Sequence, residues 1–224
     1  MQGFYLIYLK HYIQKEWRTN YMINEVKKFE RKELFEHYHS FTNPFAICTT
    51  KIDVTNIVNY CKKHRNFYAT LGFIITKTAN EIDAFKYRYK DGKIYYCEEL
   101  QSNYTQMHEN KMIGYFSVPL SNDYKEYIER FLEIQNKFFK DSKYSEESKL
   151  NDIWLSCNPW CSITSLVPTF NKEITIPQFI WDKYEKVNER YYTNLTILVH
   201  HGFADGYHIG QFVNLLEENI KGFN

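Results

Sequence analysis

The sequence predicts an α/β protein in which a mixed sheet packs against helices. Two observations point to this class. Segments with apolar residues at every second position, the period of a strand, are interspersed with segments in which apolar residues recur every three or four positions, the period of an amphipathic helix. The 224 residues contain only 5 Pro and 8 Gly, with no repeat and no linker-like tract, so one large domain with a substantial core is expected.

These two periods predict five helices and eight strands. Residues 122–139 carry a broad apolar stripe that indicates a packing helix, and Asp91-Gly92 between two alternating segments is a hairpin signal. The polar segment 140–151 is expected to be an exposed loop. The expected helices are 31–39, 54–64, 68–81, 122–139 and 206–221, and the expected strands are 45–51, 84–90, 93–98, 104–108, 153–157, 160–166, 177–183 and 193–201.

The last expected strand ends in two histidines. Apolar residues occupy every second position from Leu195 to Val199, and His201 follows in the same phase. We therefore expect His201 to point inward, with His200 turned away from it. Asp205-Gly206 then breaks the strand, and apolar residues at helical spacing follow. A base is thus placed at a strand-to-helix corner, although an isolated histidine on an apolar face is most often a hydrogen-bonded core residue.

Composition and charge exclude several classes of protein. Lys+Arg 28 against Asp+Glu 27 gives a net charge of +1, which provides no electrostatic field for nucleic acid. No stretch approaches the roughly 20 apolar residues of a transmembrane helix, so no membrane partner is expected. The five cysteines are odd in number and dispersed, which favours a reducing compartment and a cytoplasmic protein. Cys157 and Cys161 have a zinc-like spacing, but no second Cys/His pair accompanies them, so no metal is expected.

Four motifs follow one another in a consistent order. They are Phe29-Glu-Arg31-Lys-Glu-Leu-Phe35, Ser156-Cys-Asn-Pro-Trp160, Asp182-Lys-Tyr184 and His200-His201-Gly-Phe-Ala-Asp205-Gly206. Together they resemble the chloramphenicol acetyltransferase family of CoA-dependent acyltransferases, over about residues 22 to 222. The resemblance implies an α+β two-layer sandwich. It also implies a single acetyltransferase domain over residues 22–224, and leaves residues 1–21 as an N-terminal extension without a counterpart in the family.

The resemblance implies acetyl-CoA-dependent O-acetylation of chloramphenicol by direct transfer. His201 is the implied general base, because a neutral imidazole can take the hydroxyl proton and return it to the departing CoA thiolate. Ser156 is the implied donor to the oxyanion of the tetrahedral intermediate, a role worth about 2.7 to 4 kcal/mol. Arg31 and Asp205 are implied to form a structural ion pair that holds the corner. Breaking one side of a buried pair costs about 3 to 5 kcal/mol.

The resemblance also implies ligand contacts and an assembly. Trp160, Lys183 and Tyr184 match positions near the adenine and ribose phosphate of CoA, and an aromatic face and a cation suit that ligand. Tyr38 matches an acceptor-binding tyrosine, and Met107 or His108 is implied to lie near the acceptor. Family members are trimers with active sites at subunit interfaces, so a homotrimer is expected.

The acceptor side departs from the family, which leaves two alternatives. One is an acyltransferase of the same fold with a different small alcohol or amine as acceptor. The other is a catalytically silent trimeric protein that binds a ligand. A lipoamide-type acyltransferase core is disfavoured, because no Pro/Ala-rich linker precedes the motifs. The departures are Phe203, which is bulkier than the family residue, Ile180 in place of a threonine, and His37 in place of an apolar residue.

Overall fold

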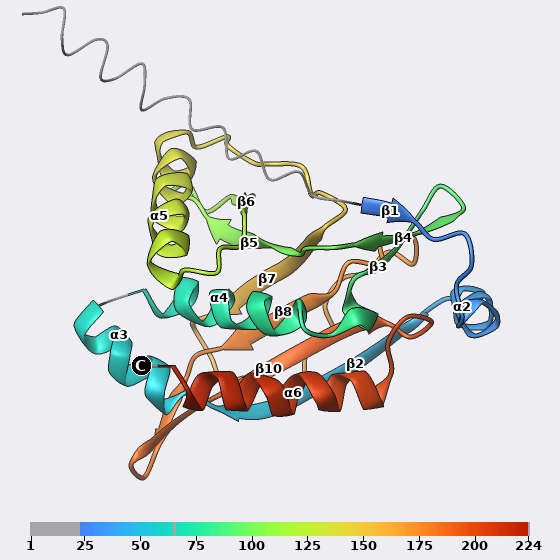
Figure 1. Cartoon of the computed structure of the whole chain (residues 1–224). Helices are drawn as coiled ribbons and strands as arrows, with labels where there is room; N and C mark the ends of the chain where they lie inside the picture. The colour runs from blue at the N-terminus through green and yellow to red at the C-terminus, as the bar shows by residue number, and fades with distance from the viewer. Residues whose placement is uncertain (1–22, 65, 224) are drawn as a thin grey trace, which may run out of the picture.

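The computed structural model describes residues 23–64 and 66–223, which are arranged around a mixed main sheet (Figure 1). Its strand order is β2-β10-β8-β7-β5-β6, with β9 paired to β10. β7 runs parallel to β5 and β8, whereas the other pairs are antiparallel. The strands are β2 (Phe45–Asp53), β5 (Gln101–Met107), β6 (Ile113–Val118), β7 (Asp152–Asn158), β8 (Gln178–Asp182), β9 (Glu185–Val187) and β10 (Arg190–His200).

A smaller antiparallel sheet extends from one side of the main sheet. Its order is β1-β4-β3, formed by β1 (Ile23–Glu25), β4 (Lys93–Cys97) and β3 (Tyr87–Lys90). A short 3-10 turn, Asp83–Phe85, precedes β3. The buried guanidinium of Arg88 joins this sheet to β7, because it donates to the carbonyl oxygens of Leu150 (2.8 Å) and Asp152 (2.9 Å).

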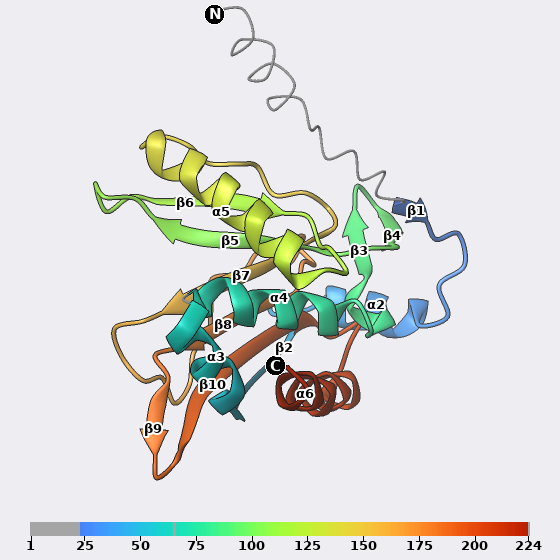
Figure 2. The same cartoon turned by 60° about the vertical axis from the view of Figure 1, so that its left-hand side comes forward.

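Four helices cover one face of the main sheet, as Figures 1 and 2 show. They are α3 (Thr55–His64), α4 (Phe67–Ala79), α5 (Tyr124–Lys140) and α6 (Gly206–Lys221). α4 is buried along most of its length, and it packs so closely on β5 that a Cβ at Gly72 would lie 2.2 Å from the hydroxyl oxygen of Tyr104. A glycine is therefore required at that crossing.

The helix α2 (Lys32–His39) lies apart from the other four, beside β3 and the end of β10. Its only fully buried side chain is Phe35, whose ring centroid is 5.2 Å from that of Tyr89 and 5.0 Å from that of His200. α2 therefore covers the end of β10 on the face that the other helices leave open. Further along that face, residues of β5, β7 and β8 and of the segments on either side of β7 line a cavity described below.

The five expected helices match α2 to α6 to within two residues at each end. Of the expected loop 140–151, Lys140 is the last residue of α5, and residues 141–151 contain no helix or strand. The strand expected at 160–166 is wrong: this segment is irregular. The backbone N–H of Ile163 donates to the carboxylate of Asp182 at 2.7 Å instead of joining a ladder. The expected strand at 84–90 begins only at Tyr87, after the 3-10 turn.

Three short strands, β1, β6 and β9, were not expected from the sequence. Gly114 lies in β6, and a glycine weakens a strand pattern. It is required there because a Cβ would lie 2.7 Å from the ring of Phe138 and from the carbonyl oxygen of Tyr144. The expected extension, residues 1–21, lies outside the described residues.

Candidate active site

The corner between β10 and α6 is a tight turn that ends at a capped helix. The N–H groups of Phe203 and Ala204 both donate to the carbonyl of His200, at 2.9 and 3.0 Å. Asp205 is the N-cap of α6, and its carboxylate accepts the N–H of Tyr207 at 3.1 Å. The N–H of His201 donates to the carbonyl of Pro44 at 2.8 Å, which ties the turn to the start of β2.

The burial of the two histidines differs from the sequence expectation, because His200 is more deeply buried than His201. Its side chain is 2% exposed, whereas His201 follows the strand and is half-buried. His200 shares a phase with Thr196 and Leu198, on the face away from the four helices, and the rings of Phe35 and Phe203 cover it there. The expectation from strand alternation rests on a strand with one buried face, but both faces of β10 are buried near its end.

His200 is held as a neutral ring by its surroundings. Burial lowers its pKa to about 3, and the charges of His39 and His201 add to the effect. Its Nδ1 accepts the N–H of Gly202 at 3.1 Å, so the proton is on Nε2, which lies 3.4 Å from Nδ1 of His39. His200 therefore stabilises the turn by accepting the N–H of Gly202 on its buried ring.

The imidazole of His201 stacks on the ring of Tyr38, with centroids 4.0 Å apart and planes 10° apart. Its Nδ1 is buried and has no hydrogen-bond partner within the described part of the chain. His37 and Phe41 lie edge-on to Tyr38, with centroids 5.2 and 5.7 Å away. Tyr38 thus packs against His201, and His37 and Phe41 pack edge-on against Tyr38.

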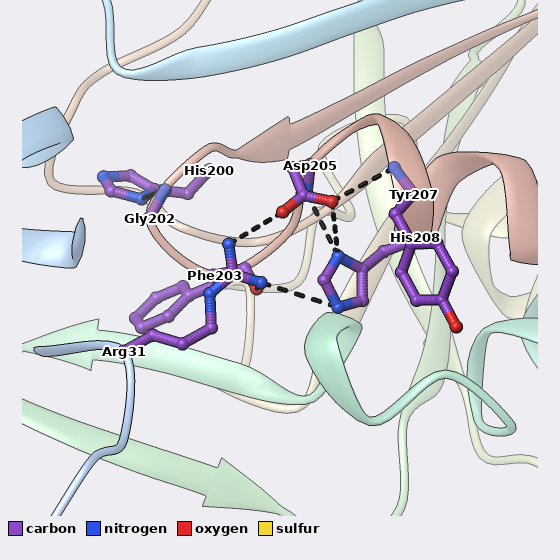
Figure 3. A network of polar contacts seen from close by, with 7 residues as sticks. All are labelled: Arg31, His200, Gly202, Phe203, Asp205, Tyr207 and His208. Carbon is purple, nitrogen blue, oxygen red and sulfur yellow. Dashed lines mark hydrogen bonds and ion pairs between the residues drawn. The ribbon is translucent and has the colours of Figure 1, made fainter.

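Arg31 and Asp205 lie together at the end of the turn (Figure 3). Nη2 of Arg31 is 2.9 Å from Oδ2 of Asp205, and Nη1 donates to the carbonyl of Phe203 at 3.2 Å. Burial tends to raise the pKa of Asp205, but the hydrogen bonds from His208 and Arg31 and the charge of Arg31 outweigh it, so this pKa is lowered. The two side chains are 27% and 32% exposed, so the pair is worth less than the cost expected for a fully buried one.

Ser156 lies in the middle of β7, on the wall of a cavity of about 550 Å³. Ile180 is its register partner on β8 and lines the same cavity, as do Thr105 and Trp154. The carboxylates of Glu146 and Glu147 complete one side. Met107 follows Thr105 by two residues, and alternation puts both on one face of β5.

Within one chain, Ser156 and His201 lie far apart. Ser156 pairs with Ile180, which pairs with Thr196, so Ser156 is two strands from β10 at the level of Thr196. His201 lies five residues further along. At roughly 3.3 Å per residue and 4.8 Å per strand, the two side chains are separated by about 16 Å along the sheet and about 10 Å across it.

Trp160, Lys183 and Tyr184 lie near one another at the C-terminal ends of β7 and β8, where Asn158 is paired with Asp182. Trp160 is 70% exposed and Lys183 is exposed. Tyr184 is 37% exposed and its ring centroid lies 4.8 Å from that of Phe67. An aromatic surface and a cation are therefore accessible at this edge.

Asp182 organises that edge, and sequence reasoning did not single it out. Its carboxylate accepts from the N–H of Ile163 and from the side chains of Thr193 (2.7 Å) and Asn194 (2.8 Å). Burial tends to raise its pKa, but these hydrogen bonds outweigh it, so the pKa is lowered. No local pattern could have identified this role, because the donors lie 11 to 19 residues away, on the neighbouring strand β10 and in the segment after β7.

The three departures noted in the sequence have different surroundings. Ile180 lines the cavity, and His37 lies edge-on to Tyr38. Phe203 is 3% exposed and packs against Phe35 and Phe29, with centroids 4.7 and 5.5 Å away. Its bulk therefore fills the core beneath the turn and does not narrow the cavity.

No group of three or more His, Cys, Asp or Glu residues in the described ranges could hold a metal ion. Among residues 23–64 and 66–223, no helix is long and apolar enough to cross a membrane.

Comparison with known proteins agrees with this architecture. The model of the chloramphenicol acetyltransferase family matches residues 19–217. A chloramphenicol acetyltransferase of Staphylococcus aureus is 30% identical over 201 residues, which cover 87% of this chain and 93% of that protein. A solved chloramphenicol acetyltransferase superposes with a TM-score of 0.76 at 22% identity, covering 89% of this chain and 99% of the other. The catalytic core of the 2-oxoacid dehydrogenase multienzyme complex from Thermoplasma acidophilum superposes with a TM-score of 0.66 at 14% identity, covering 89% and 98%.

The protein is therefore an acyltransferase with a mixed sheet packed against helices. More particularly, the chain belongs to the chloramphenicol acetyltransferase family.

Proposed function

We propose that the protein is an acetyl-CoA-dependent O-acetyltransferase that inactivates chloramphenicol. The observation that carries the proposal is the fixed position of His201. One face of its ring is covered by Tyr38, and the ion pair of Arg31 and Asp205 holds the turn that contains it. A base must be held still to accept a proton in a defined direction. The S. aureus relative is a chloramphenicol acetyltransferase, which supports the choice of acceptor.

The proposed reaction needs no acyl-enzyme. His201 removes the proton from the acceptor hydroxyl while the oxygen attacks the thioester carbonyl of acetyl-CoA. Ser156 donates a hydrogen bond to the oxyanion of the tetrahedral intermediate. As the intermediate collapses, the carbon–sulfur bond breaks, and His201 returns the proton to the thiolate. The products are the acetyl ester and free CoA, and the imidazole is neutral again.

The separation of Ser156 from His201 supports a homotrimer with shared active sites. About 16 Å along the sheet is too far for both side chains to act on one tetrahedral intermediate. We therefore propose that His201 of one subunit faces the Ser156 cavity of its neighbour. An isolated subunit would then be inactive.

In this arrangement the exposed edge formed by Trp160, Lys183 and Tyr184 binds the adenine and ribose phosphate of CoA. The aromatic surface and the ammonium group are matched to those two parts of the ligand. Tyr38 and Met107 contribute to the acceptor side. The reaction would take place in the cytoplasm, where acetyl-CoA is available.

A different small alcohol or amine as the acceptor is the second candidate. The cavity favours it through Ile180, which supplies no hydroxyl, and through Glu146 and Glu147, which bring negative charge to one wall. The third candidate, a silent trimeric protein, would bind the ligand without turnover.

The test is CoA thiol release from acetyl-CoA by the purified protein at near-neutral pH, with and without chloramphenicol. Release that depends on chloramphenicol, and that is abolished in His201→Ala, is the expected result. Release only with other hydroxyl or amine acceptors would establish the second candidate. Thermal stabilisation by CoA or chloramphenicol, without thiol release with any of these acceptors, would favour the silent protein and contradict the proposal.

A further inference from the structure

The Arg31–Asp205 pair has a third member. The imidazole of His208, on the first turn of α6, bridges the two charged groups (Figure 3). Its Nδ1 lies 2.9 Å from Oδ1 of Asp205, and its Nε2 lies 3.5 Å from Nη1 of Arg31. The same Nη1 donates to the carbonyl of Phe203 in the turn. The three side chains therefore close a triangle in which every pair is in polar contact.

The triangle determines which ring nitrogen of His208 carries the proton. A guanidinium group can only donate, so Nε2 must accept from Arg31. The proton is then on Nδ1, which donates to the carboxylate of Asp205 in a charge-assisted hydrogen bond. The opposite tautomer would place an unprotonated Nδ1 against the carboxylate and an N–H against the N–H of Arg31. Only the bond from the backbone N–H of Asp205 to Nδ1, at 3.3 Å, would favour that tautomer.

A histidine is suited to this position because it is a neutral group with a donor at one end and an acceptor at the other. Position N3 of a capping box is usually Glu or Gln. A glutamate there would bring a second carboxylate beside Asp205. A side chain without polar atoms would remove one of the donors to Oδ1 of Asp205, which would keep the N–H of Tyr207, and would remove the acceptor that faces Arg31. His208 satisfies both groups while only 21% exposed.

We propose that His208 is a positioning residue, which as the neutral Nδ1-protonated tautomer holds Asp205 and Arg31 in place and so orients the turn that carries His201. Its effect on catalysis rests on the proposed function of His201. The connection is through Arg31, which contacts His208 and the carbonyl of Phe203 with one nitrogen. Rotation of Arg31 away from this position would release the middle of the turn.

The first test is the tautomer of His208, which requires no catalytic turnover. Long-range proton–nitrogen NMR correlations of protein labelled with ¹⁵N-histidine report which ring nitrogen is protonated, and the signals that disappear in His208→Gln assign the residue. We expect the Nδ1-protonated form near neutral pH. The Nε2-protonated form would overturn the proposal, and so would a doubly protonated ring. Failure to find any acceptor for the enzyme would leave this readout intact.

The second test separates positioning from general stability. His208→Phe keeps a ring without donor or acceptor, and it should lower kcat about tenfold, the loss of one hydrogen bond to a charged group, with unchanged KM for acetyl-CoA. His208→Gln keeps a donor and an acceptor, and should restore kcat to within about threefold. The control is Tyr207→Phe, because this neighbouring side chain is 70% exposed and its hydroxyl contacts only Gln211 among the described residues.

The outcomes are distinguishable. If the folded Phe variant keeps the parental kcat while its melting temperature falls, His208 is merely structural and the proposal is wrong. If the Gln variant is as slow as the Phe variant although both fold, the donor–acceptor requirement is wrong. A fast Gln variant together with a slow Phe variant supports the proposal.

Discussion

The ring of Tyr38 lies parallel to the imidazole of His201, with centroids 4.0 Å apart. Tyr38 belongs to α2, near the start of the described chain, whereas His201 follows the last strand. The orientation of the proposed base is therefore set by a helix distant in sequence as well as by its own turn.

Replacing His201 by alanine should abolish acetyl transfer while the protein still folds. General-base catalysis contributes about 10² to 10⁴ in rate, so thiol release in His201→Ala should fall by at least that factor. The melting temperature should change little, because the side chain is half-buried and makes one ring contact. Near-parental turnover in the folded variant would contradict the assignment of His201.

Removing the stacked ring should weaken catalysis without removing the base. A stacked pair is worth about 0.5 to 1.5 kcal/mol, so Tyr38→Leu should lower kcat by up to about tenfold. Tyr38→Phe is the matched control, because it keeps the ring and loses only the hydroxyl. If both variants lose the same kcat, the hydroxyl matters and the stacking does not. Steady-state kinetics with varied acceptor separates the two.

Loss of the Ser156 hydroxyl should slow the chemical step. A single oxyanion donor contributes about 10² to 10³ in kcat, and Ser156→Ala should lose that much with a similar KM for acetyl-CoA. Ser142→Ala, in the exposed segment after α5, is the control and should keep the parental rate. A Ser156→Ala enzyme within threefold of the parent would exclude the serine as the oxyanion donor.

Phe203 should matter for stability. Its ring is 3% exposed and is packed against Phe35 and Phe29, so Phe203→Ala should lower the free energy of unfolding by about 3 to 5 kcal/mol. Phe139→Ala is the comparison: that ring is 45% exposed, and the loss should stay near 1 kcal/mol. Urea unfolding at one protein concentration gives both values. If Phe203→Ala lowered the free energy of unfolding only slightly and altered the acceptor preference, the side chain would instead be assigned to the acceptor pocket.

The buried His200 should make the protein less stable as the pH falls. Burial lowers its pKa to about 3, below the value of about 6.5 expected in the unfolded chain. Between these two values the unfolded state binds more protons, so the free energy of unfolding falls as the pH drops below 6.5. From pH 7.5 to 5.5 the contribution is about 1 kcal/mol.

His200→Gln removes the titrating group, and it keeps an acceptor for the N–H of Gly202. Chemical denaturation of both proteins at the two pH values checks the effect. The parent should lose about 1 kcal/mol more than the variant. Equal pH dependence in the two proteins would show that His200 is not held neutral by the fold.

Much of the secondary structure could be predicted because it depends on local patterns of apolar and turn-forming residues. The stripe at 122–139 became α5, and the Asp91-Gly92 turn joins β3 and β4. The strand expected at 160–166 is wrong, because the backbone N–H of Ile163 donates to the side chain of Asp182 and not to a neighbouring strand. β6 was missed because Gly114 weakens the pattern and is explained only by its close approach to Phe138.

The sequence by itself determined which chemistry the chain carries: histidines at the end of a strand, an Asp-Gly that starts a helix, and a serine motif upstream. Only the tertiary structure decided how these groups are arranged. It buried His200 in place of His201, because α2 covers the second face of β10. It also closed Arg31, Asp205 and His208 into one network and separated Ser156 from His201. The physical reason is that periodicity reports which side chains share a face, whereas the element covering that face is selected by packing between segments distant in sequence.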